Sequence, residues 1–226
     1  MRSANRGRGL AHVGSGALAC AAPVGGSFLL KKQASFDLAH VLETGSKAER
    51  TIALGEVAKN PDLWPQVRPL AAKLLGGTEN EVRADVLALI DTHKDTGLLA
   101  AVHPLLLDSN DDVREKALRC VRDLASKDSA PALFEAAQKE EDEYLKVEFG
   151  EALLELGDLR GVPPILAVIT DGEAEQARKD AWEHLRAHLP VPAGLEKGSA
   201  GELQKWWTDN QGKLTSDHAG VFKLAP

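Results

Sequence analysis

The chain has 226 residues, of which 43% are hydrophobic, 4% are aromatic and two are cysteine. That length is enough for one domain or a short array of repeats with a substantial core, and two cysteines exclude a disulfide-rich scaffold. Beyond residue 34 the chain holds 22 basic and 34 acidic residues, a net charge of −12, against −7 for the whole chain. Such an acidic region disfavours a nucleic-acid-binding surface.

The N-terminal segment, residues 1–34, contains five basic residues and no acid, and its residues 10–30 form an uncharged, moderately apolar run. An Ala-Leu-Ala pattern at 17–19 directly precedes Cys20 and resembles the cleavage site of a secretory or lipoprotein signal. The run is too rich in glycine for a stable membrane span. We expect a flexible segment, and an exported or membrane-tethered protein and a cytoplasmic one stay open as alternatives.

A motif recurs five times along the rest of the chain, at intervals of 33, 31, 32 and 32 residues. The copies begin at Glu49, Val82, Val113, Leu145 and Ala177. The second residue of every copy is basic: Arg50, Arg83, Arg114, Lys146 and Arg178. The fifth is apolar: Ala53, Val86, Ala117, Phe149 and Ala181. The ninth is also apolar: Val57, Ile90, Val121, Leu153 and Leu185. This spacing predicts an amphipathic helix, helix B, in each copy.

A second apolar helix, helix A, precedes each of the last four copies, and we expect it at residues 62–75, 97–107, 131–139 and 163–169. Asn60 and Pro61 predict a capped helix start, and Thr78 with Glu81 matches a capping box. Three glycines predict helix ends: Gly76, Gly77 and Gly157. A pair of helices this short cannot bury its apolar face alone, so stacking of neighbouring pairs is expected.

The stretch VHPLLLDSNDDVREKALRCV, residues 102–121, resembles a HEAT repeat, particularly the short bacterial form of phycobilisome-lyase-type arrays. The resemblance covers roughly residues 35–189. It implies an all-α, right-handed α-α superhelix, a HEAT-like solenoid of about five repeats. We assign residues 35–192 to this array and residues 193–226 to a linker, a capping helix and a disordered tail.

Charged residues recur around the turn between helix A and helix B. Asp108 stands six residues before Arg114, and Glu140 stands six residues before Lys146. No acid stands at the corresponding places before Arg83 and Arg178, which are occupied by glycines. We expect Arg114 to belong to a ladder of arginines that pair with acids at the turns and in neighbouring repeats, in preference to a row that binds external anions.

The fourth copy of helix B is strongly acidic. Residues 140–143 are all acidic, and Glu148, Glu151 and Glu155 follow at helical spacing on one face. An ordinary solvated face explains this pattern. The alternative is a docking patch for a protein partner with a basic surface.

The C-terminal region contains a short amphipathic segment, in which Leu203, Trp206 and Trp207 share one helix face. The last repeat of a solenoid exposes its apolar side unless it is capped. We therefore expect a capping helix, with an exposed aromatic binding site as the alternative, and no structure after Leu214.

Other kinds of site find little support. His184 and His188 are four residues apart but lack a third metal ligand nearby, and the chain has no His-Glu dipeptide of the kind that HEAT-type metal hydroxylases use. The outward positions of the last three B helices carry mixed charges, which argues against DNA: Glu115, Arg119, Arg122, Glu148, Glu151, Glu155, Lys179, Glu183 and Arg186. No phosphate-binding loop or nucleophile motif is present.

These observations predict a scaffold or adaptor of a bacterial cell that binds another protein, without catalysis, cofactor or metal. Its binding candidates are Glu148, Glu151, Glu155, Trp206 and Trp207. A bilin lyase or isomerase is one alternative, because that family shares the repeat. A structural envelope protein is the other, and a processed N-terminus would favour it.

Overall fold

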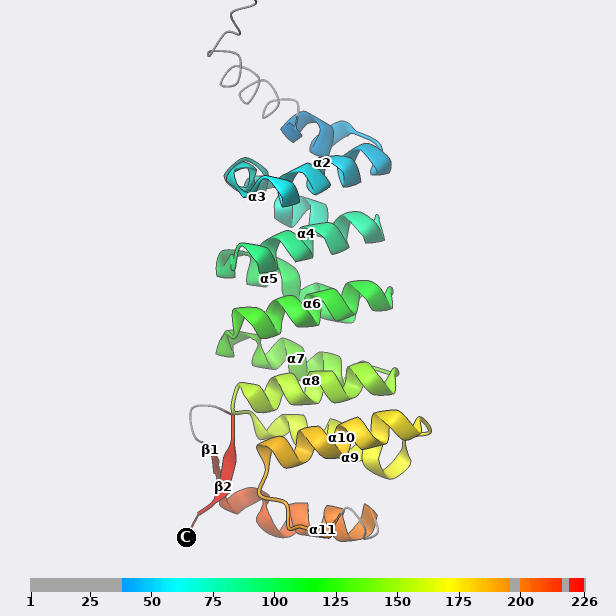
Figure 1. Ribbon diagram of the computed structural model, residues 1–226, viewed down its shortest axis with the longest axis vertical. Helices are drawn as coiled ribbons and strands as arrows, with labels where there is room; N and C mark the ends of the chain where they lie inside the picture. Colours follow the sequence, from blue (N-terminus) through cyan, green and yellow to red (C-terminus); the bar gives the residue numbers. More distant parts are fainter. Residues whose placement is uncertain (1–37, 196–199, 217–219, 226) are drawn as a thin grey trace, which may run out of the picture.

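The computed structural model describes residues 38–195, 200–216 and 220–225. The expected N-terminal segment, with its signal-like pattern, lies outside these residues. Within them the chain forms five helix pairs, a further helix and a short β-hairpin (Figure 1).

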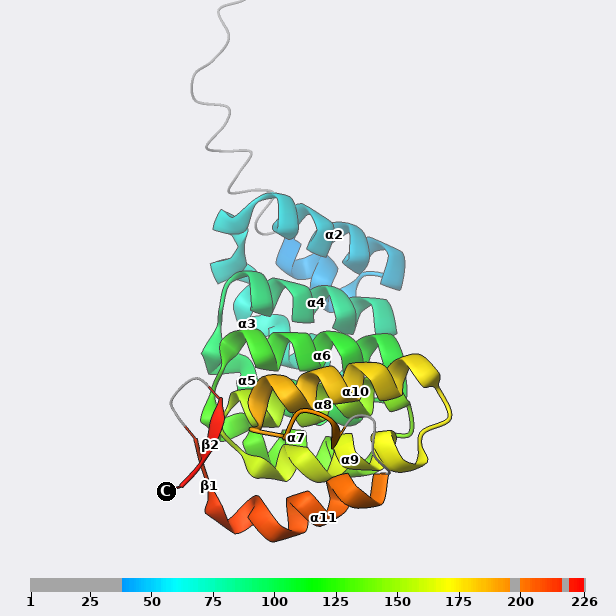
Figure 2. The ribbon, with the colours of Figure 1, turned by 60° about the horizontal axis from the view of Figure 1, so that its bottom comes forward.

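The B helices form one layer of the stack: α2 (Lys47–Lys59), α4 (Asn80–Thr92), α6 (Asp111–Leu124), α8 (Glu143–Glu155) and α10 (Glu175–His188). The A helices form the other: helical residues 38–44, α3 (Trp64–Leu75), α5 (Leu99–Val102) with the 3₁₀ turn His103–Leu107, α7 (Ala130–Lys139) and α9 (Val162–Asp171). Figure 2 shows the same two layers from another side. Consecutive B helices contact one another along the stack, which confirms the predicted all-α solenoid.

The apolar positions of the repeat form its core. All residues at the fifth and ninth places of the B helices are buried, and those at the ninth place are at most 1% exposed. Two buried clusters result. The first core extends from Leu38 to Leu153, and the second from Val147 to Phe222. Helix α8 supplies Phe149 to the first core and Leu154 to the second, so it is the element that both share.

Helix α8 touches the 3₁₀ turn Leu159–Gly161, which leads into α9, through two glycines. A Cβ atom built on Gly150 would lie 2.7 Å from the carbonyl oxygen of Gly161 and 2.6 Å from Cγ1 of Ile165. A Cβ atom on Gly161 would lie 2.1 Å from the carbonyl oxygen of Gly150. No other residue type allows the two backbones to approach this closely.

The predicted boundaries hold in part. Pro61 begins a 3₁₀ turn and Gly76 follows α3 directly, as expected, but the Asn60 side chain makes no capping hydrogen bond. The capping box predicted from Thr78 and Glu81 is wrong, because α4 begins after Glu79 without a side-chain cap. A capping box instead opens α2, where Ser46 and Glu49 exchange hydrogen bonds.

The C-terminal end closes the stack. Helix α11 (Ala200–Asn210) contacts α9, and its Leu203 is 0% and its Trp207 7% exposed within the second core. Strands β1 (Leu214–Ser216) and β2 (Phe222–Leu224) then form an antiparallel hairpin with Leu214 opposite Leu224. The expectation of a tail without structure after Leu214 is therefore wrong for both strands. Burial of Phe222, which is 3% exposed, explains the difference, because it anchors the hairpin to the core.

Candidate protein-binding site

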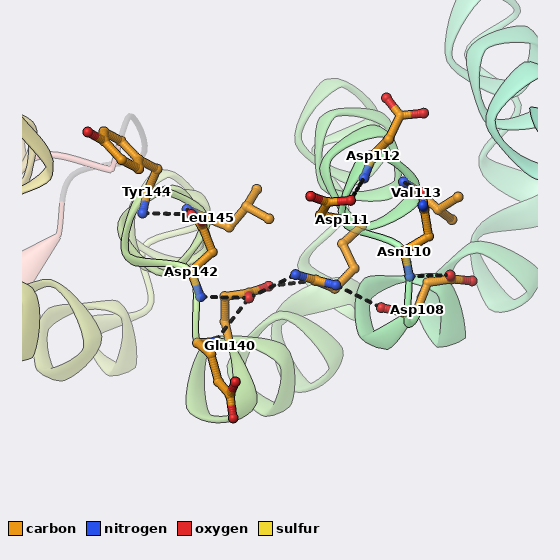
Figure 3. A network of polar contacts seen from close by, with 11 residues as sticks. Asp108, Asn110, Asp111, Asp112, Val113, Glu140, Asp142, Tyr144 and Leu145 are labelled. Carbon is orange, nitrogen blue, oxygen red and sulfur yellow. Dashed lines mark hydrogen bonds and ion pairs between the residues drawn. The ribbon is translucent and has the colours of Figure 1, made fainter. Parts of the chain in front are cut away.

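A polar network at the start of α6 connects the third repeat to the fourth (Figure 3). Arg114 donates from Nε and Nη2 to the Glu140 carboxylate at 2.7 and 3.1 Å, and from Nη1 to the Asp108 carbonyl at 3.0 Å. Glu140 also accepts hydrogen bonds from the backbone N–H groups of Glu141 and Asp142. The Glu140 side chain is 3% exposed. Arg114 is thus a link between repeats, as predicted.

The same link occurs in the two preceding repeats. Arg83 donates to the Asp108 carboxylate at 2.8 Å and to the Gly77 carbonyl at 2.7 Å, and Arg50 donates to Glu79 at 2.8 Å. We call Arg50, Arg83 and Arg114 with their acidic partners the arginine ladder. An acid at the turn therefore pairs with the arginine of the preceding repeat. The arginine that follows the acid in sequence takes a backbone carbonyl of its own turn.

The fourth repeat has Lys146 at the position of the ladder arginines, and a different residue links it to the fifth repeat. Here Glu143 of α8 accepts hydrogen bonds from the N–H groups of Glu173 and Ala174 at 2.7 and 2.9 Å. These two bonds lower the pKa of the Glu143 carboxyl. Arg178 donates to the carbonyl of Gly172, within its own repeat. A carboxylate thus provides the connection between repeats that an arginine provides elsewhere.

Glu151, one of the predicted binding residues, lies between three basic side chains. Arg122 of α6 donates to it at 2.8 Å, Nδ1 of His184 is in direct contact with it, and Nε2 of His188 lies 3.8 Å away. The Glu151 side chain is 12% exposed. It therefore joins α6, α8 and α10, and we call these four residues the Glu151 cluster.

Electrostatics in the Glu151 cluster favour the charged forms. Burial raises the pKa of Glu151, but hydrogen bonding to His184 and His188 and the charge of Arg122 outweigh burial, so its pKa is well below the usual range. The hydrogen bond to Glu151 raises the pKa of both histidines against the effect of their own burial. A carboxylate facing imidazolium groups is the expected state at mildly acidic pH.

Glu155 is also engaged within the chain. Arg122 donates to its carboxylate at 2.7 and 3.0 Å, although the side chain is 40% exposed. The interpretation of Glu148, Glu151 and Glu155 as an ordinary solvated face is therefore wrong for the last two, which pair within the chain. The sequence signal was Arg122 itself, which lies on the outward face of the preceding B helix.

Glu148 has a different environment, with no hydrogen bond or ion pair to any described residue. Burial raises its pKa, although the positive charge of Arg122 acts in the opposite direction. It lies in a groove of about 310 Å³ between the starts of these helices. We call this the acidic groove, and its lining residues are Asp111, Asp112, Glu115, Asp142, Tyr144, Leu145 and Glu148.

The acidic groove contains five carboxylates and no basic side chain among its lining residues. Tyr144 is 45% exposed, and Figure 3 shows it near Asp142 at the start of α8, with its ring directed away from α6. Asp112 and Glu115 pair with basic residues of their own helix at i,i+4 spacing, and such exposed pairs are weak. The groove therefore retains a strongly negative potential.

The two tryptophans of α11 differ in position. Trp207 is 7% exposed in the second core, and Trp206 is partly buried at its edge. Trp207 thus occupies the place that a capping residue requires. Only Trp206 keeps an accessible surface, so the two residues do not form a joint exposed patch.

The histidine pair does not form a metal centre in the part of the chain that the structure describes. No group of three or more His, Cys, Asp or Glu side chains there could hold a metal ion. His184 and His188 instead share Glu151 as a common partner.

Helix pairs stacked in two layers and linked from repeat to repeat by polar side chains define an α-solenoid protein. The chain belongs to the HEAT repeats, a family that matches residues 53–153 and 98–186. No curated protein matches it. None of the helices in the described residues has the length and apolar character that a membrane crossing needs. The relation to phycobilisome-lyase-type arrays stays a prediction.

Proposed function

We propose that this protein is an adaptor that binds another protein through the B-helix layer, with the acidic groove receiving a basic segment of the partner. HEAT arrays are typical protein-interaction scaffolds, which supports the general role. The observation that carries the specific proposal is Glu148, a partly buried carboxylate that forms no hydrogen bond or close ion pair with any described residue.

Glu148 favours a cation for physical reasons. A carboxylate removed from water is destabilised, and an incoming lysine or arginine side chain compensates for that cost with a charge-assisted hydrogen bond. The surrounding carboxylates attract such a side chain from a distance and repel phosphate groups. The proposal involves no catalytic step.

Backbone NMR spectra with two peptides of equal length test this function, one rich in lysine and arginine and the other with glutamate in their place. The basic peptide should shift the amide signals of Tyr144, Leu145 and Glu148, and the shifts should diminish in salt, which screens surface charge over about 8 Å at physiological ionic strength. The acidic peptide should leave these signals in place.

Glu148→Gln should weaken binding of the basic peptide. Glu135→Gln is the matched control, because Glu135 lies on α7 and pairs only with the nearby Lys139. Equal affinity of both variants, or shifts confined to other helices, would contradict a role for the groove.

A further inference from the structure

The C-terminal segment lies against the end of α8 in a position that requires glycine. Gly220 has a φ of +72°, and a Cβ atom built on it would lie 2.7 Å from the Leu154 carbonyl oxygen and 2.9 Å from Cα of Glu155. Phe222 follows and enters the second core. Residues 220–225, which we call the C-terminal strap, are therefore held by close backbone packing at Gly220, by the buried Phe222 side chain and by their pairing with β1.

A histidine connects this strap to the body of the solenoid. Nδ1 of His188, in α10, lies 2.9 Å from the carbonyl oxygen of Gly220, and Nε2 lies 3.8 Å from Oε1 of Glu151. The His188 side chain is 11% exposed. A carbonyl oxygen only accepts hydrogen bonds, so Nδ1 must carry a proton.

With a proton on Nδ1, the charge of the His188 ring depends on whether Nε2, which faces Glu151, is also protonated. A neutral ring protonated on Nδ1 presents a bare Nε2 lone pair to the Glu151 carboxylate. The imidazolium form donates from Nδ1 to the Gly220 carbonyl and turns its positively charged Nε2 N–H toward the Glu151 carboxylate, 3.8 Å away, which attracts it. The geometry therefore selects the protonated ring while the strap is in place.

The charged groups around His188 support this selection. Glu151 and Glu155 of α8 face it, and both favour the cation. His184 of α10 and Arg122 of α6 contact the same Glu151 carboxylate from other sides. The strap contributes the Gly220 carbonyl. The pKa of His188 is raised mainly by its interaction with Glu151, against the effect of burial.

We propose that His188 is a pH-sensitive latch: its imidazolium form holds the C-terminal strap on the solenoid more tightly than its neutral form does, because a charged N–H group binds the Gly220 carbonyl more strongly than a neutral one. The strap is then docked at mildly acidic pH and increasingly released as the pH rises. Release removes Phe222 from the second core, where it is 3% exposed, and so uncovers apolar surface. This inference does not depend on what binds the acidic groove.

Amide hydrogen exchange in the full chain, corrected for the intrinsic pH dependence of exchange, tests the latch. Protection of the Ala225 N–H, which bonds to the Lys213 carbonyl, should fall as the pH rises through the pKa of His188, read from its ring signals in the same samples. Linkage sets the size: docking weakens about tenfold for each unit by which it raises that pKa. Amides of α6 serve as an internal reference and should keep their protection.

Two histidine variants separate the latch from general electrostatics. His188→Gln should leave a strap whose protection no longer depends on pH in this range. His184→Gln should keep the pH dependence, because the partner of the His184 ring is Glu151 of α8. Strap protection that stays constant with pH, or an unaltered dependence in His188→Gln, would overturn the proposal. So would a His188 pKa at or below that of an ordinary histidine in the unaltered protein, a result that requires no variant.

Discussion

The guanidinium of Arg114 and the carboxylate of Glu140, which belong to consecutive repeats, face each other through two hydrogen bonds of 2.7 and 3.1 Å. Each partner also satisfies backbone groups of its own turn, so the pair fixes the position of two loops at once. Removal of one partner leaves a charge in a shielded place without compensation, and such losses are costly.

Glu140→Gln should therefore lower the free energy of unfolding by about 3 kcal/mol, the lower end of the range for breaking a buried ion pair, since glutamine keeps one acceptor oxygen. Urea denaturation measures this change. The neighbouring Glu141 is exposed, and Glu141→Gln should change stability by less than about 0.5 kcal/mol. Similar denaturation midpoints for the two variants would argue against a structural role for the ladder.

The contact between α8 and α9 gives a matched pair of glycine variants. Gly150→Ala places a methyl group within 2.6 Å of Ile165, and overpacking of this kind should cost about 2–3 kcal/mol. Gly55→Ala, in α2, meets no atom within 4 Å and should stabilise the helix by up to about 1 kcal/mol. Opposite shifts in thermal melting are the expected result, and shifts of the same sign would place the close contact elsewhere.

Trp207→Ala should destabilise the protein by about 3 kcal/mol or more, as large aromatic side chains do when they are removed from a core. Trp206→Ala should cost clearly less, because Trp206 is only partly buried. Melting temperatures and gel filtration measure both. If Trp206→Ala proves the more damaging, the capping face of α11 is turned differently from the one described.

Glu151→Gln should lower stability at neutral pH by roughly 2–3 kcal/mol, somewhat below the usual cost of breaking a buried pair, because Arg122 keeps Glu155. Its pKa in the folded state is below the unfolded value of about 4.3. The stability that it contributes is therefore present above the unfolded pKa and lost as the pH falls toward the folded one.

Denaturation of the parent and Glu151→Gln proteins over a series of acidic pH values checks this sign. The histidines are protonated in both folded and unfolded states well below their unfolded pKa of about 6.5, so they add little to the slope there. The stability difference between the two proteins should shrink as the solution becomes more acidic. A difference that grows would mean that Glu151 does not hold its charge in the folded state.

The periodic part of the fold could be read from the sequence, because burial in a solenoid repeats with the chain. The basic second residue and the apolar fifth and ninth residues of each copy were enough to locate the B helices. The same pattern assigned Arg114 to the ladder. In a solenoid each repeat packs against the next one in sequence, so the period also predicted which helix pairs are in contact.

The individual contacts could not be predicted in the same way. Glu151 and Glu155 looked like free charges because their partner Arg122 is about 30 residues away and looked like another outward charge. The C-terminal hairpin was missed for a related reason. Its strands are three residues long and are held by Gly220 and Phe222, which fit surfaces made by other segments.

Helix α8, which supplies side chains to both cores, has a mechanical consequence. In a solenoid each repeat is stabilised mainly by its neighbours, so disruption spreads along the stack from a weak end. A single molecule pulled from its two termini should accordingly extend in two stages, one for each core. Helix α8 should unfold only in the second stage, because after one core has opened it still packs against the other.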